Sequence, residues 1–218
     1  MRRWFTLFAA TAALAGCGGH AGRVDPGTAA LRAFTQLLAR ADQSTYTAEY
    51  LAGGVVVTHV RVAPWLAYRS AVAAYLLAPD ATYLCRTAPD KRPACDRAPG
   101  ADSLPMAHAR RIAQPAEGGF VTPELVVSAI AGAVTRPYAV NRHGRTIAGQ
   151  HADCVEVTGT DRLTACATDE GVLALVDGRL PGRPPVRTEL TRYSPTAPPD
   201  AFALPPGAQV RDVEDLAP

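Results

Sequence analysis

Four cysteines in two closely spaced pairs constrain this chain more than any other feature of its sequence. Cys85 lies near Cys95 and Cys154 lies near Cys166, while a fifth cysteine stands apart at position 17. In an exported chain an even number of cysteines favours disulfides. Of the three possible pairings we expect the local one, with Cys85–Cys95 across a proline-containing loop and Cys154–Cys166 across a hairpin. A Cys₄ zinc site is the alternative, but the usual C-x₂₋₄-C spacing is absent.

The first residues of the chain predict export. Arg2 and Arg3 form a basic end, an apolar run from Trp4 to Ala15 follows, and the run ends in Leu14-Ala15-Gly16-Cys17. A run of about a dozen residues is too short for a bilayer core, which needs roughly 20, but it is typical of a signal peptide. The last four residues resemble a lipobox, in which Cys17 accepts diacylglycerol. An ordinary secretory signal with an incidental cysteine is the alternative.

These features divide the chain into three parts. We expect a lipoprotein signal peptide over 1–16, a lipidated cysteine and tether over 17–25, and a single domain over 26–218. Two or three acyl chains on Cys17 would anchor the protein stably, at about 0.8 kcal/mol per buried CH₂. The predicted location is therefore the cell membrane, lipid-anchored on its extracytoplasmic face. Fully extended, the tether spans roughly 25 Å, which keeps the domain near the membrane.

The charge balance bears on the kind of partner. The chain carries 22 Lys and Arg against 20 Asp and Glu, and the leader contains Arg2 and Arg3 but no acid, so the exported part is neutral. Recognition of nucleic acid begins with a basic footprint, so we expect no nucleic-acid partner. Lys91 is the single lysine among many Ala, Arg, Gly and Pro residues, which indicates a GC-rich genome of the actinobacterial sort.

The apolar patterning predicts two helices among many strands. The first helix begins at Asp25-Pro26, with Asp25 as its cap, and the second follows Thr122, with Pro123 in its first turn. Short apolar runs separated by turn residues predict antiparallel strands. These lie at 45–51, 55–62, 65–77, 81–86, 139–147, 151–158, 163–168, 172–176 and 186–193. We expect a loop over 88–119 and an irregular C-terminal segment.

This order of elements, together with Leu190-Thr191-Arg192-Tyr193 and the segment from Phe202 to Ala208, resembles the LolA-like superfamily. That superfamily includes LolA-, LolB-, LppX- and RseB-type proteins of the bacterial envelope. The resemblance implies an α+β fold in which a strongly curved antiparallel half-barrel sheet has helices covering its concave face.

The resemblance also implies a function. A cavity between sheet and helices would bind or carry a lipid or another hydrophobic ligand. Apolar and aromatic residues of the first strands are candidates for its lining, namely Val55, Val57, Trp65, Tyr75 and Tyr83. These residues are alternatively packed core. The alternative functions are an RseB-like sensor, which binds an envelope protein without a transported ligand, and a structural envelope lipoprotein.

Signals for catalysis are missing from the sequence. It contains no G-x-S-x-G elbow, no H-E-x-x-H and no S-x-x-K with a K-T-G box. The histidines His59, His108, His143 and His151 are scattered. We therefore expect no enzyme, no catalytic residue, no metal site and no cofactor. The expected partners are the membrane, through the lipid anchor, and a hydrophobic ligand or an envelope protein.

Overall fold

The computed structural model describes residues 25–99, 115–116, 119–133, 137–159, 161–180 and 182–213. The predicted leader, Cys17 and the tether up to residue 24 lie outside the described residues. Most of the loop predicted over 88–119 lies outside them as well.

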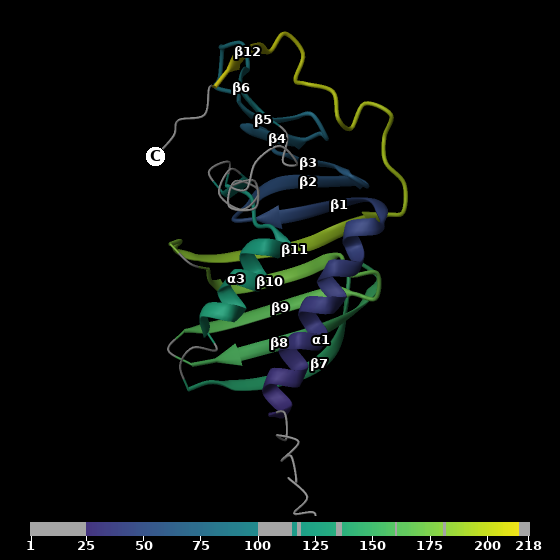
Figure 1. Cartoon of the computed structure of the whole chain (residues 1–218), viewed down its shortest axis with the longest axis vertical. Coiled ribbons are helices and arrows are strands. Elements are labelled where there is room, and N and C mark those ends of the chain that lie inside the picture. Colours follow the sequence, from purple (N-terminus) through teal and green to yellow (C-terminus); the bar gives the residue numbers. More distant parts are fainter. Residues whose placement is uncertain are drawn as a thin grey trace, which may run out of the picture.

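A single twelve-stranded sheet is the frame of the described chain (Figure 1). Its strand order is β12-β6-β5-β4-β3-β2-β1-β11-β10-β9-β8-β7, so two antiparallel meanders meet where β1 pairs with β11. The first meander consists of β1 (Thr45–Ala52), β2 (Val55–Val62), β3 (Trp65–Arg69), β4 (Ala73–Leu77), β5 (Ala81–Arg86) and β6 (Ala94–Pro99). The second consists of β7 (Ala139–Ile147), β8 (Gln150–Thr158), β9 (Arg162–Thr168), β10 (Leu173–Arg179) and β11 (Pro185–Ser194).

Strand register assigns each side chain to one of two faces, because successive residues of a strand point to opposite sides. We call one side the helix face; it carries Tyr50, Tyr68 and Val155, and the helices pack on it. We call the other side the strap face; it carries Val60 and Leu76, and the chain after β11 packs on it.

The first helix, α1 (Pro26–Arg40), begins at the residue that the sequence predicts. The Asp25 carboxylate accepts a hydrogen bond from the Thr28 backbone N–H at 2.9 Å. Pro26 occupies the first turn, where its missing N–H removes no hydrogen bond of the helix. Leu31, Phe34 and Leu38 are buried against β8–β10. A short 3₁₀ turn, η1 (Ala41–Gln43), connects α1 to β1.

The second described helix, α3 (Pro123–Ala133), also begins where the sequence predicts. Thr122 Oγ1 accepts a hydrogen bond from the Leu125 backbone N–H at 3.3 Å. Leu125, Val126 and Ile130 are buried, so α3 packs beside α1 on the helix face.

The predicted fold class is wrong. The sheet is mixed and open, and it dominates the fold, whereas the expected fold was an antiparallel half-barrel covered by helices. β12 (Gln209–Asp212) runs parallel to β6, and the main strand contacts of α1 and α3 are with the second meander (Figure 1). Helical covering is therefore limited to one part of the sheet.

The single strand predicted over 65–77 is two strands, β3 and β4. Ser70 turns the chain between them: its side-chain oxygen accepts hydrogen bonds from the backbone N–H groups of Val72 and Ala73, at 3.3 and 3.1 Å. A serine hydroxyl that binds the backbone in this way replaces the Gly or Pro that a turn usually shows.

Two further strands, β6 and β12, lie where the sequence predicts loop or irregular chain. Their residues have low strand propensity, but ion pairs support their backbone pairing. Arg211 lies 2.7 Å from Asp96, and Arg97 lies 3.3 Å from Asp212. The partners are more than a hundred residues apart, so local sequence patterns contain no trace of this pairing.

Both predicted disulfides are confirmed. Cys85 lies directly opposite Cys95 on β5 and β6, and Cys154 lies directly opposite Cys166 on β8 and β9. Two disulfides indicate an exported protein. Among the described residues, no helix is long and apolar enough to cross a membrane.

Candidate functional site: an apolar groove beside the C-terminal strap

The chain between β11 and β12 forms a strap across one face of the first meander. This strap, residues 195–208, follows one end of strands β1–β5 toward β12 (Figure 1). Ala201 is buried against Val60, Ala67 and Leu76, which all point to the strap face. The small side chain of Ala67 on β3 therefore lets the strap backbone approach the sheet.

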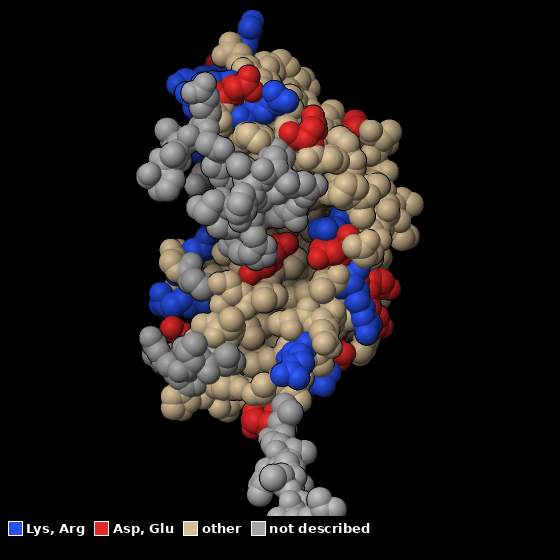
Figure 2. Space-filling model, in the orientation of Figure 1, with Lys and Arg blue, Asp and Glu red and all other residues tan. Residues whose placement is uncertain are grey.

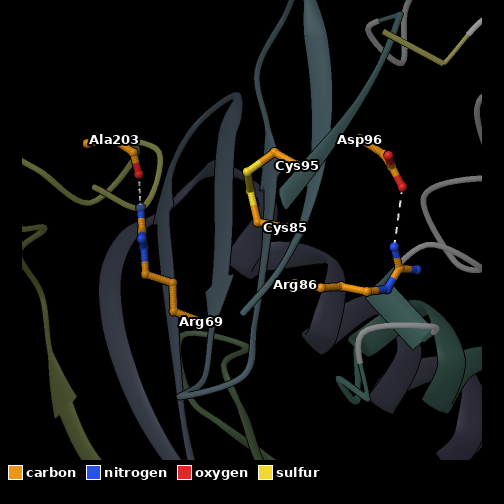
Figure 3. The surroundings of a disulfide bond; sticks show 6 residues. All are labelled: Arg69, Cys85, Arg86, Cys95, Asp96 and Ala203. Atoms are coloured by element: carbon orange, nitrogen blue, oxygen red, sulfur yellow. Dashed lines mark hydrogen bonds and ion pairs between the residues drawn. A yellow bond between two sulfur atoms is a disulfide. The ribbon is translucent and has the colours of Figure 1, made fainter. Parts of the chain in front are cut away.

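Side chains of the sheet hold the strap in place. The Arg69 guanidinium donates two hydrogen bonds to the Ala201 carbonyl, at 3.0 and 3.2 Å, and another to the Ala203 carbonyl (Figure 3). Thr47 Oγ1 donates to the Thr196 carbonyl at 2.7 Å. Partial burial lowers the pKa of Arg69, and the nearby Asp200 carboxylate opposes that shift. Arg69 stays charged, and its hydrogen bonds to carbonyls are of the strong, charge-assisted type.

The Cys85–Cys95 disulfide lies under the end of the strap. Both sulfurs are on the strap face, where Cys85 and Cys95 are buried with Ala74 against Leu204. In Figure 3 the disulfide lies between the Arg69–Ala203 contact on one side and Arg86 with Asp96 on the other. The bridge thus fixes β5 to β6 where the strap arrives.

A groove of about 240 Å³ opens between the strap and strands β3–β5. Trp65, the first residue of β3, is 39% exposed, and its ring centroid lies 5.6 Å from that of Phe202 on the strap. One carboxylate side chain, Asp80, and one phenol, Tyr83, contribute to the lining. The full lining is Trp65, Leu76, Leu77, Ala78, Asp80, Tyr83, Phe202 and Leu204. The apolar and aromatic side chains of such a surface bind apolar groups by excluding water.

The opposite face of the same strands is filled by aromatic side chains. His59 stacks on Tyr68 at 4.2 Å and meets Tyr46 edge-on at 5.1 Å, and Phe120 stacks on Tyr68 at 5.5 Å. Burial lowers the pKa of His59 to about 3, with Arg61 adding to the effect, and burial raises the pKa of Tyr50 and Tyr68. This part of the helix face is packed core.

The five residues predicted to line a ligand cavity lie on both faces of the sheet. Val57 and Tyr75 are buried in the core of the helix face, and Val55 lies on the same side but is 45% exposed beside the β1–β2 turn. Trp65 and Tyr83 are together in the groove on the strap face. The sequence analysis missed Phe202 and Leu204, whose apolar side chains at alternate positions before Pro205 were the available signal.

A second, polar hollow of about 390 Å³ lies between α1 and the strands β7 and β8. Phe34, Leu37 and Val155 line it together with Arg40, Arg142, Asp153 and Asp169. At its edge, His151 Nδ1 lies 3.0 Å from the Asp169 carboxylate, and this hydrogen bond raises the pKa of His151. Both side chains are largely exposed, and charges of both signs are interspersed over the visible described surface (Figure 2).

Comparison with known proteins adds little information on the function of these surfaces. No family model matches the sequence, and no curated protein matches it. Among solved structures, the chain is similar to PNGF-II, with 9% sequence identity and a TM-score of 0.40. The match covers 79% of this chain and 31% of the PNGF-II chain, so this chain spans about a third of that protein's length. A likeness of this size carries no information on function or on a LolA-like relationship.

Proposed function

We propose that this protein is a lipid-anchored, extracytoplasmic binding protein whose groove beside the strap holds an acyl chain or an apolar group of similar width. The observation that carries the proposal is the groove itself: the partly exposed Trp65, whose ring lies against that of Phe202 at a tilted angle, borders a hollow lined mainly by apolar and aromatic side chains. Exposed apolar surface of this kind usually marks an interaction site.

Membrane anchoring is the second part of the proposal. It rests on the basic end, apolar run and lipobox-like Leu14-Ala15-Gly16-Cys17 of the sequence, and the disulfides of an exported protein support it. An acyl-binding groove suits a protein held near a bilayer, because acyl chains are the most abundant apolar groups there.

A tryptophan fluorescence titration tests the groove. The sequence has two tryptophans, and Trp4 belongs to the predicted leader, so Trp65 is the single reporter in the exported chain. Adding palmitate to the chain that begins at Gly18 should change the Trp65 emission in a saturable way, with one palmitate per protein.

Two variants make the titration specific. The double variant Phe202→Ala/Leu204→Ala should weaken palmitate binding at least about tenfold, because it removes the strap side of the groove. Val210→Ala, an exposed position on β12 that does not line the groove, is the matched control and should bind like the wild type. Emission that palmitate leaves unchanged would refute the acyl-chain proposal.

One observation favours a second candidate function, an RseB-like sensor or protein-interaction module. The groove, at about 240 Å³, is smaller than the roughly 300–1,000 Å³ of most small-molecule sites, and packed side chains fill the helix face beside it. A hollow of that size suits an aromatic or branched side chain of a partner protein. A folded protein that binds no palmitate would favour this function.

A further inference from the structure

Four large apolar side chains are exposed together at one end of the first meander. Leu51, Val55 and Val56 flank the Gly53-Gly54 turn between β1 and β2, and Val72 lies in the turn between β3 and β4. Their exposed fractions are 46%, 45%, 59% and 58%. We call these four residues the apolar rim.

Strand direction brings the two turns of the apolar rim side by side. β1, β3 and β5 run in the same direction in the sheet, so the turns that follow them lie at one end (Figure 1). Thr58 pairs with Arg69 on the adjacent strand, so Val56 and the β3–β4 turn both lie just beyond this pair. The rim is therefore formed by two turns at the same end of the sheet.

The next turn along this end is basic. The backbone N–H of Thr87 donates to the Val72 carbonyl at 2.8 Å, which ties the loop 87–93 to the apolar rim. Lys91 and Arg92 are exposed in that loop, and neither forms an ion pair with a described carboxylate. No Asp, Glu, Lys or Arg occurs between residues 50 and 58. The uncharged apolar rim thus lies beside a loop with two exposed basic residues, in which Asp90 is the acid.

We propose that the apolar rim docks on the surface of a membrane that contains anionic lipids, with Lys91 and Arg92 among the headgroups. Apolar side chains at exposed turns can enter the boundary between headgroups and acyl chains, and basic residues beside them favour an anionic lipid surface as the partner. Each basic residue near an anionic surface strengthens binding about fivefold.

The predicted lipid anchor makes this orientation possible. The inference rests on the proposed function in this respect alone, since the tether brings the domain to the bilayer.

Vesicle co-sedimentation of the anchor-free chain tests the proposal. The chain beginning at Gly18 should sediment with vesicles of phosphatidylglycerol and phosphatidylcholine in equal parts, and less with pure phosphatidylcholine. The double variant Val56→Asp/Val72→Asp should lower the bound fraction at least about fivefold. Both positions are exposed, so the variant keeps the fold, which its unchanged Trp65 emission verifies.

A matched control and a charge variant complete the test. Val210→Asp changes a valine that is 46% exposed on β12, outside the rim, and should bind like the wild type. Lys91→Gln/Arg92→Gln should weaken binding to the anionic vesicles alone. The proposal is overturned if the wild type binds neither vesicle, or if the rim variant and Val210→Asp bind equally. These results are independent of the palmitate titration and of the fate of Cys17.

Discussion

His59 is an ionisable residue buried in the aromatic core of the helix face. Its ring lies between Tyr46 and Tyr68, its Nδ1 lies 3.4 Å from the Tyr46 hydroxyl, and its Nε2 has no hydrogen-bond partner among the described residues. An imidazole in such surroundings stays neutral, because charging it would place an uncompensated cation in the core.

This burial makes stability depend on pH. Burial lowers the pKa of His59 from 6.5 to about 3, so between these values the unfolded chain binds a proton that the folded chain does not bind. The contribution of His59 is therefore complete above pH 6.5, and it falls by up to about 1.4 kcal/mol per pH unit as the pH decreases toward 3.

The variant His59→Phe should remove this acid sensitivity, because a phenyl ring keeps the stacking and cannot be protonated. Urea unfolding at pH 7.5 and pH 5 measures it: between the two, the wild type should lose about 2 kcal/mol more than the variant. Equal losses would contradict the buried neutral imidazole.

His151 provides a control of opposite sign. Asp169 raises the pKa of His151, so its contribution is present at low pH and is lost as the pH rises through the raised pKa. The variant His151→Gln should therefore be less stable than the wild type at low pH, whereas His59→Phe should gain stability relative to the wild type as the pH falls. Because His151 is exposed, the effect should also shrink in high salt.

At the scale of elements, the strap depends on Arg69. The variant Arg69→Met keeps the apolar stem and removes the hydrogen bonds to the Ala201 and Ala203 carbonyls. Hydrogen exchange should become about tenfold faster at the strap amides of Ala201 and Ala203, while β8 and β9 keep their protection. The exposed Arg162→Met is the control. Unchanged exchange in the strap would show that apolar packing alone holds it.

The two disulfides should contribute similarly to stability. Their sequence separations are 10 and 12 residues, and the loop-entropy relation gives about 2.5 to 3 kcal/mol for loops of this length. Cys85→Ala/Cys95→Ala and Cys154→Ala/Cys166→Ala should each lower the free energy of unfolding by about that amount, measured by urea denaturation. A loss in one pair much larger than in the other would mean that packing around the sulfurs, and not chain entropy, dominates.

The elements predicted correctly are those that local sequence determines. Asp25 and Pro26 mark the start of α1, and the spacing of Cys154 and Cys166 around a hairpin indicates their register. By contrast, β12 forms through contacts with β6, and Phe202 meets Trp65 from the far end of the chain. Such pairings depend on tertiary structure. Neither the strap nor the groove can therefore be deduced from secondary-structure propensity or from the periodicity of apolar residues.

At the scale of the whole molecule, one open sheet carries two meanders with different coverings. Helices α1 and α3 pack on the second meander, and the strap packs on the opposite face of the first. The expectation of helices across a concave face came from the order of elements, which does not determine where in the sheet a helix packs. The site that follows from the observed arrangement is the groove at Trp65, on the side away from the helices.

The proposal that this protein works at a membrane depends on Cys17. Replacing Cys17 with Ala should move the protein from the membrane fraction to the soluble fraction, because the acyl chains supply most of the anchoring. The rim variant Val56→Asp/Val72→Asp should leave the lipidated protein in the membrane fraction. Retention of the Cys17→Ala variant in membranes would exclude lipid on this cysteine as the main anchor.

The most direct test is the mass of the N-terminal peptide from the protein isolated from its own membranes. The account predicts a chain that begins at Cys17 and carries diacylglycerol. A chain that begins elsewhere, or an unmodified Cys17, would contradict it.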